Sequence, residues 1–234
     1  MRIDLSSSEC TYWHLKKFNI FESFDVDELE AVTKILRLNE FCKKDPIVLP
    51  VKEERRIYFL MKGKAKLSRI DDTGKEFILE ILQAGEIFGP IAYPEKHYYD
   101  AQVIALQKCI VGHIPERDFN KLLSDKPELC LAINKIIGTR LLKIENRLEE
   151  LLFKNVPSRL ANLLLHLSVK YPHQNPCGVQ VDIRLTQREL ANLIGASREV
   201  TSTTLNRFKS SGWIEVHKHH ICLHNVKALK NISI

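Results

Sequence analysis

The sequence has no apolar run long enough to cross a bilayer, and its start lacks the apolar core of a signal peptide. Asp4, Glu9, His14 and the adjacent Lys16 and Lys17 interrupt the first twenty residues. These absences argue against a membrane-spanning or secreted protein. Because 44% of the 234 residues are hydrophobic, the chain can bury a substantial core. We therefore expect a folded protein of the cytoplasm, with no membrane partner.

Spacings typical of metal centres are also missing. The six cysteines lie far apart and include no CxxC pair, which argues against a zinc knuckle and an iron–sulfur cluster. We expect most of these thiols to be reduced and buried, and we predict no metal site. Cys10 and Cys177 fall in segments expected to be exposed, so a redox-sensing role stays open for them.

Groupings of side chains that support catalysis are absent as well. We find no Ser/His/Asp grouping and no phosphate-binding glycine loop before a helix. The sequence therefore does not predict an enzyme.

Charge is divided unevenly along the chain. Residues 1–156 hold 25 basic and 25 acidic side chains, whereas residues 157–234 hold 10 and 4, so the last third supplies the whole net charge of +6. A basic unit joined to a neutral one is typical of a nucleic-acid binder, although a solvated basic face is the alternative.

The first half of the chain has the pattern of a small β domain behind a short helix, which we expect to include Val26–Leu38. Stretches rich in β-branched or aromatic residues follow, separated by turn signals such as Asp71-Asp72-Thr73-Gly74. We predict strands at Ile47–Val51, Arg56–Met61, Ala65–Ile70, Phe77–Leu82 and Gln102–Ile110. Their spacing indicates an all-β barrel or roll.

A long helix is predicted from about Pro127 to Lys154, with apolar residues in alternating steps of four and three. This heptad stripe is interpreted as a dimer seam, with packing against the chain's own β domain as the alternative. The seam residues are Ile137, Leu141, Ile144, Leu148 and Leu151.

Val156-Pro157-Ser158 interrupts this pattern and predicts a hinge. Beyond it we expect a helix at Leu160–Val169, a loop at Tyr171–Gly178 and a strand at Val179–Leu185.

Leu185–Phe208 has the pattern helix, turn, helix. Thr186 and Glu189 form a capping box, Gly195 suits the turn, and Ser197 can cap the second helix. The expected inner faces are Leu190, Ala191 and Ile194 in the first helix, and Val200, Thr204, Leu205 and Phe208 in the second.

The residues left outside suit contacts with DNA, although any two short helices around a glycine could give the same pattern. Arg198, Glu199, Ser202 and Thr203 are predicted base readers, and Arg207 lies further along the same helix. Thr186, Gln187 and Ser197 suit phosphate contacts.

The last part of the chain predicts a two-stranded wing, formed by Gly212–Val216 and Ile221–Leu223. Lys218, His219 and His220 lie at its turn. Since no carboxylate or thiolate nearby completes a metal shell, this turn is interpreted as facing phosphate.

Together these features resemble the CRP/FNR family, named after the cyclic-AMP receptor protein and the fumarate–nitrate regulator. The resemblance is strongest over Leu185–Ile214 and extends to Phe153–Leu160 and Gly85–Gly89. It implies an α+β fold with a cyclic-nucleotide-binding-like β-roll (residues 1–125), a long dimerisation helix (126–155) and a winged helix-turn-helix (156–234). It also implies a homodimer that reads a near-palindromic site in double-stranded DNA and contacts RNA polymerase.

The chain departs from the family pattern where the effector is decided. By resemblance, the effector pocket comprises Gly85, Glu86, His97, Tyr99, Asp100, Arg140, Ile144 and Glu145. Members that bind cyclic AMP hold its phosphate with an Arg-Ser pair, but Tyr99 and Asp100 stand there, and a carboxylate repels phosphate. Their polar pair on the dimer helix is replaced by Ile144 and Glu145, so we expect an effector other than cyclic AMP.

Other sensing chemistries of the family stay partly open. Haem is an option through His97, whereas the iron–sulfur branch needs an N-terminal cysteine cluster and only Cys10 occurs there. Many members carry a second arginine at the position of Thr203, so the preferred half-site is expected to differ. Two alternatives remain: an effector-independent or haem- or redox-responsive regulator, and a small-molecule-binding module with vestigial DNA binding.

Overall fold

The computed structural model describes residues 14–49, 55–91, 101–175, 178–181, 183–217 and 220–233. The chain forms two compact units. One extends to Gly74 and includes Leu79–Arg140, and the other includes Lys75–Ile78 and the chain from Leu141 onward. The boundary between the two units falls between Arg140 and Leu141, inside the long helix that was predicted as a separate part, residues 126–155.

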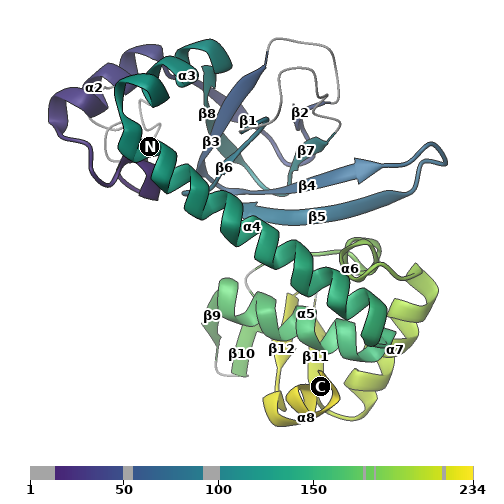
Figure 1. Cartoon of the computed structure of the whole chain (residues 1–234). Helices are drawn as coiled ribbons and strands as arrows, with labels where there is room; N and C mark the ends of the chain where they lie inside the picture. The colour runs from purple at the N-terminus through teal and green to yellow at the C-terminus, as the bar shows by residue number, and fades with distance from the viewer. Residues whose placement is uncertain are drawn as a thin grey trace. The chain divides into compact units, whose positions relative to one another are not determined.

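The first unit is built on two four-stranded antiparallel sheets, with strand orders β1-β8-β3-β6 and β2-β7-β4-β5 (Figure 1). The expected all-β roll is confirmed. Its strands are β1 (Arg37–Phe41), β2 (Pro46–Val48), β3 (Arg56–Lys62), β4 (Lys64–Ile70), β5 (Glu76–Gln83), β6 (Ile87–Phe88), β7 (Gln102–Ala105) and β8 (Cys109–Pro115).

Two boundaries predicted for this unit are wrong. Helix α2 (Val26–Ile35) ends before Leu38, because Leu36 takes an extended conformation and Leu38 pairs with Gly112 in the first sheet. The single strand predicted at Gln102–Ile110 is two strands, since β7 pairs with β4 in one sheet and β8 with β3 in the other. Val51 lies outside the described residues.

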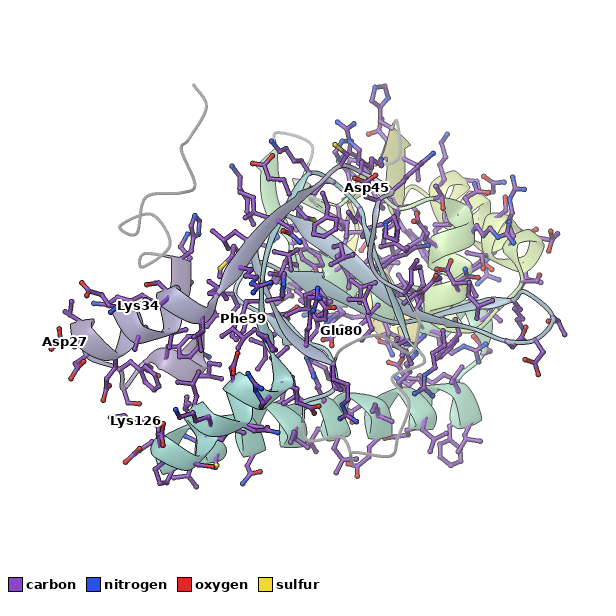
Figure 2. The ribbon with its side chains drawn as sticks, turned by 90° about the horizontal axis from the view of Figure 1, so that it is seen from above. Asp27, Lys34, Asp45, Phe59, Glu80 and Lys126 are labelled. Atoms are coloured by element: carbon purple, nitrogen blue, oxygen red, sulfur yellow. The ribbon has the colours of Figure 1, made fainter. Side chains whose placement is uncertain are left out.

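Aromatic side chains fill the interior between the first sheet and the helices. Phe59 of β3 is 0% exposed and lies at the centre of this packing (Figure 2). The ring of Phe18 meets it edge-on at 5.4 Å, and the ring of Phe21 stacks on it at 5.7 Å. Leu129 of the long helix joins the same cluster, so the start of that helix belongs to the core of the first unit.

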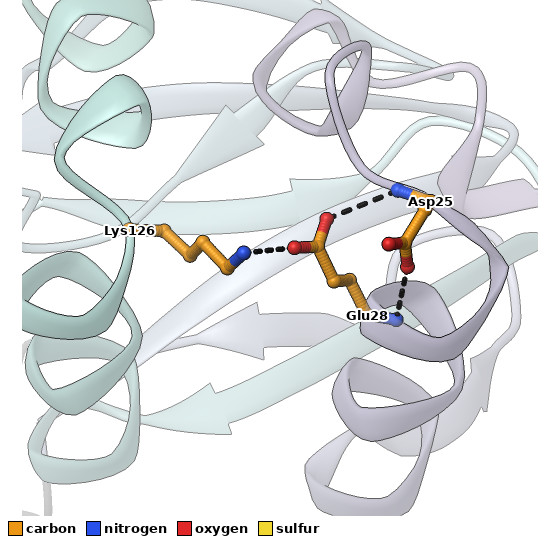
Figure 3. A network of polar contacts seen from close by, with 3 residues as sticks. All are labelled: Asp25, Glu28 and Lys126. Carbon is orange, nitrogen blue, oxygen red and sulfur yellow. Dashed lines mark hydrogen bonds and ion pairs between the residues drawn. The ribbon is translucent and has the colours of Figure 1, made fainter.

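A polar network ties α2 to the junction of α3 (Glu116–Asp125) and α4 (Pro127–Phe153) (Figure 3). Asp25 caps α2 by accepting from the Glu28 amide at 2.9 Å, and the Asp25 amide donates to Glu28 Oε2 at 3.0 Å. The other carboxylate oxygen of Glu28 pairs with Lys126 Nζ. The hydrogen bond from Lys126 lowers the pKa of Glu28, so this carboxylate stays ionised in the network.

The second unit holds a four-stranded antiparallel sheet of order β11-β12-β10-β9 and the helices after α4. The elements are α5 (Val156–Lys170), β9 (Pro172–Asn175), β10 (Gly178–Val181), α6 (Gln187–Ile194), α7 (Arg198–Ser210), β11 (Ile214–His217), β12 (His220–Leu223) and α8 (Val226–Ser233). The predicted wing is confirmed as β11 and β12, whereas Lys218 and His219 lie outside the described residues.

Four predictions around α5 need correction. The helix starts at Val156, because Asn155 caps it by accepting from the Ser158 amide at 3.0 Å, and Pro157 is tolerated in a first turn. The interruption after α4 therefore falls at residues 154–155. Strand β9 occupies part of the predicted loop because it pairs with β10, and β10 ends at Val181, well before Leu185.

The four described cysteines are free thiols. Cys109 and Cys222 are buried, whereas Cys42 and Cys130 are exposed, so the expected burial is found for only two of these four. Burial raises the pKa of the Cys109 thiol, which makes it less reactive. Cys10 and Cys177 lie outside the described residues. Within the described part of the chain, no helix is long and apolar enough to cross a membrane.

Candidate nucleic-acid interface

The first helix of the motif, α6, begins with the predicted capping box. Thr186 Oγ1 accepts from the Glu189 amide at 3.2 Å, and the Thr186 amide donates to Glu189 Oε2 at 2.8 Å. The Thr186 hydroxyl also bonds to the same carboxylate, at 2.9 Å. Leu190, Ala191 and Ile194 are buried, as predicted. The box fixes where α6 starts and therefore which of its residues face outward.

The turn between the helices depends on Gly195. Its φ of 63° and ψ of 43° are left-handed, as predicted for a glycine that ends a helix. A Cβ at this position would lie 2.9 Å from Leu151 Cδ2. The left-handed backbone therefore favours glycine, and an added Cβ would also require the tip of the Leu151 side chain to shift.

The second helix, α7, begins at the predicted cap, with Ser197 Oγ accepting from the Val200 amide at 3.3 Å. Thr204, Leu205 and Phe208 are buried as predicted. Val200 is not: it is 47% exposed, and Thr201 is buried in its place. The Thr201 hydroxyl donates to the Ser197 carbonyl at 2.8 Å, so a polar residue fits the inner face without an unpaired group.

The outer face of α7 presents the predicted base readers at its N-terminal half. Arg198, Glu199 and Thr203 are exposed, and Ser202 is half-buried. The backbone amide at the helix start and the Ser197 hydroxyl lower the pKa of Glu199, so it presents a carboxylate acceptor. The Thr203 hydroxyl donates to the Glu199 carbonyl at 3.0 Å, and its oxygen can still accept a hydrogen bond.

Further polar residues gather around this face. Gln187 and Thr186 are exposed at the start of α6, and Arg207 is exposed late in α7. Arg188, Asn206 and Lys209 were not predicted as site residues, but they line a hollow of about 1090 Å³ together with Gln187, Ser197, Arg198 and Glu199. Arg188 and Asn206 are sequence neighbours of the predicted contacts Gln187 and Arg207, which was the available signal, whereas Lys209 lies two residues beyond Arg207.

The wing has its own polar contacts. Arg184 Nε donates to His220 Nε2 at 2.9 Å, and His224 lies 3.3 Å from Glu215. Phe208 and Trp213 pack their rings 5.3 Å apart and so join α7 to β11. The described residues contain no group of three or more His, Cys, Asp or Glu side chains that could hold a metal ion.

Comparison with known families gives two matches in chain order. Residues 38–126 match the cyclic nucleotide-binding domain, and residues 158–232 match the Crp-like helix-turn-helix domain. The chain belongs to the CRP/FNR family of transcription regulators. Its relatives and its fold are those of DNA-binding regulators rather than enzymes.

Similar proteins cover most of the chain. A "CRP-like cAMP-activated global transcriptional regulator" of Mycobacterium tuberculosis is 26% identical over 215 residues, which cover 92% of this chain and 96% of the relative. A "global nitrogen regulator" of Synechococcus elongatus is 28% identical over 198 residues, covering 83% and 88%. The solved structure of a CooA variant from Carboxydothermus hydrogenoformans has 25% identity and a TM-score of 0.77, covering 94% of this chain and 98% of that one.

The apolar stripe of this CRP/FNR protein is open to solvent in the single chain. Ile137, Leu141, Ile144 and Leu148 are 37%, 54%, 63% and 56% exposed. Leu151 differs, because it is partly buried beside Gly195.

The predicted effector residues are only partly described. Gly85 has a φ of 92°, and Glu86 Oε2 closes the same turn by accepting from the Gln83 amide at 2.8 Å. Arg140 donates to the carbonyl of Ile87, which places it next to this turn within the first unit. Ile144 and Glu145 are exposed on the part of α4 that belongs to the second unit. His97, Tyr99 and Asp100 lie outside the described residues.

Proposed function

We propose that this regulator acts as a homodimer that places α7 of each protomer in the major groove of a near-palindromic operator. The observation that carries the proposal is the exposed row Arg198, Glu199 and Thr203 at the start of α7. In helix-turn-helix proteins this part of the second helix contacts base edges. The net positive charge of residues 157–234 supplies sequence-independent attraction to phosphate.

Each exposed group has a defined recognition chemistry. The Arg198 guanidinium can donate two hydrogen bonds to a guanine edge, and the Glu199 carboxylate can accept from a cytosine amino group. Thr203 offers a methyl group for contact with thymine. An arginine, which many family members carry at this position, would instead donate hydrogen bonds. Thr186, Gln187 and Ser197 suit phosphate contacts at the two helix starts.

The exposed stripe on α4 supports the homodimer. A row of apolar side chains with heptad spacing is stabilised when a second helix covers it. A two-fold dimer places two copies of α7 about one DNA turn apart, which matches a near-palindromic operator. We also propose that it contacts RNA polymerase, as the resemblance to the family implies.

The proposed effector binds the first unit and is not cyclic AMP, although several relatives are named as cAMP-activated. Within that unit, the Glu86 carboxylate is already engaged by the Gln83 amide, which donates to it at 2.8 Å. A binding event in the β-roll would act on the helix-turn-helix of each protomer through α4 and the interruption at residues 154–155. Another similar chain is named for nitrogen regulation and not for cyclic AMP.

The experiment is selection of bound sequences from random duplex DNA with purified protein and no added ligand. A palindromic consensus supports the proposal, whereas sequence-blind binding both before and after addition of a host-cell small-molecule extract would refute it. Arg198→Ala should then weaken binding to the selected site by about 1–3 kcal/mol and leave most nonspecific, salt-dependent binding intact. The matched control is Arg117→Ala, which removes an equal charge from an exposed position on α3.

A further inference from the structure

Arg147 lies on the second half of α4 and is not used by the proposed DNA contacts. Its Nη1 donates to the Ile78 carbonyl, and its Nη2 to the Leu193 carbonyl, both at 2.6 Å. A longer contact of 3.4 Å joins Nη2 to the Asn192 carbonyl. All of these residues belong to the second unit. One side chain of α4 therefore contacts both the start of β5 and the end of α6.

The contacts on α6 fall where a helix leaves its carbonyls without partners. Since α6 ends at Ile194, the carbonyls of Asn192 and Leu193 are among the last four of the helix and need donors from elsewhere. A cation is also favoured there by the helix dipole. Arg147 meets both requirements with one planar group.

The surroundings hold the guanidinium in this place. It lies 4.1 Å from the centroid of the Phe77 ring, a cation–π distance. Beside it, the Asn192 side chain donates to Glu76 Oε2 at 3.1 Å, a second link between α6 and β5. Desolvation lowers the pKa of Arg147 to about 10, against the opposing effect of Glu150, so the group is still a cation at neutral pH.

We propose that Arg147 is a positioning residue that fixes the orientation of the reading head, residues 186–210, on α4. The proposal rests on the proposed function, because orientation matters only if two heads read one operator. A dimer recognises two half-sites at one spacing only if each head is held at a fixed angle to the dimer helix. A single half-site makes no such demand.

The test compares the wild type, Arg147→Met and Lys143→Met on four kinds of duplex. These are the selected operator, versions with the centre lengthened or shortened by one base pair, and a single half-site. We expect Arg147→Met to lose about tenfold on the operator, the effect of one charge-assisted hydrogen bond. It should also discriminate less between spacings, while its half-site affinity and the whole profile of Lys143→Met stay unchanged.

The outcomes separate the two proposals. Unchanged preference for one spacing in Arg147→Met would refute the positioning role alone, and an equal loss on the half-site would show a general structural role instead. Absence of sequence-specific binding by the wild type would refute the proposed function. If Arg147→Met does not fold, Arg147→Lys replaces it in the test. Lysine keeps the charge but cannot bond both carbonyls as a planar fork, so this variant should also discriminate less between operator spacings, and an unchanged preference would refute the positioning role.

Discussion

Glu28 joins two helices through the two oxygens of one carboxylate. One oxygen accepts from the Asp25 amide at the start of α2, and the other pairs with Lys126 beside α4. Both contacts favour the ionised form, so the pKa of Glu28 is lowered in the folded protein, mainly by Lys126. A carboxylate with a lowered pKa stabilises the fold above its unfolded value of 4.5, and this contribution disappears as pH falls through the folded value.

Glu28→Gln should therefore be less stable than the wild type at neutral pH. The difference in the free energy of unfolding should be constant above about pH 5.5 and should shrink as the pH falls through 4.5 and below. Urea denaturation between about pH 7 and about pH 3 measures it. Glu30→Gln on the same helix is the control, and a gap for Glu28→Gln that persists at the lowest pH would contradict the assignment.

Single residues were predictable where their role depends on near neighbours. The caps at Thr186 and Ser197 and the turn at Gly195 follow from the few residues around them. Val200 was placed wrongly because an apolar side chain was expected inside, whereas Thr201 pairs its own hydroxyl within the helix. Arg147 could not be found, because its partners Ile78 and Leu193 lie far away in the sequence.

At the scale of elements, the turn between α6 and α7 can be tested by replacing Gly195 with alanine and comparing the effect with the same change at Gly138. Gly195 has a left-handed backbone and Leu151 Cδ2 close to the missing Cβ, whereas nothing lies within 4 Å of a Cβ at Gly138 in α4. Gly195→Ala should destabilise the protein by about 1–3 kcal/mol. Gly138→Ala should stabilise it by about 0.5–1 kcal/mol, because alanine favours a helix interior.

Chemical denaturation of both variants measures these two free energies. Opposite signs are expected from the same added methyl group. Equal changes in the free energy of unfolding for the two variants would mean that neither the left-handed turn nor the contact with Leu151 makes Gly195 special for stability.

Elements were predicted well where the alternation of side chains is strong, as in β3 and β4. Strand β1 was missed because three of its five residues are exposed, so its pattern is weak. The two residues of β6 are too few to form a pattern. The break inside Gln102–Ile110 depends on which sheet each half joins, and that is decided by tertiary pairing.

For the whole molecule, the stripe on α4 predicts how the chain assembles. Ile144 and Leu142 are 63% and 60% exposed, but only Ile144 belongs to the heptad row. Ile144→Asp should weaken self-association by at least about tenfold, because an apolar contact is replaced by facing charges. Leu142→Asp, on the other side of the helix, should leave it unchanged.

Sedimentation equilibrium with both variants separates these expectations. A dimer of wild-type strength in Ile144→Asp would overturn the seam, and equal weakening by Leu142→Asp would indicate a different face. The architecture itself was predictable from the order of the patterns, and the family comparison confirms it. The effector was not, because the residues predicted for its pocket come from distant stretches of the sequence, and three of them lie outside the described residues.

The buried threonines of α7 have a consequence for how such a regulator can change over generations. Thr201 and Thr204 donate their hydroxyls to carbonyls of the helix cap and the preceding turn, so the inner face is complete without help from the outer one. Mutations at Arg198, Glu199 or Thr203 therefore leave the packing of the head intact. Under the proposed function these three side chains contact the bases, so substitutions there would give descendants of this protein new target genes while the fold stays the same.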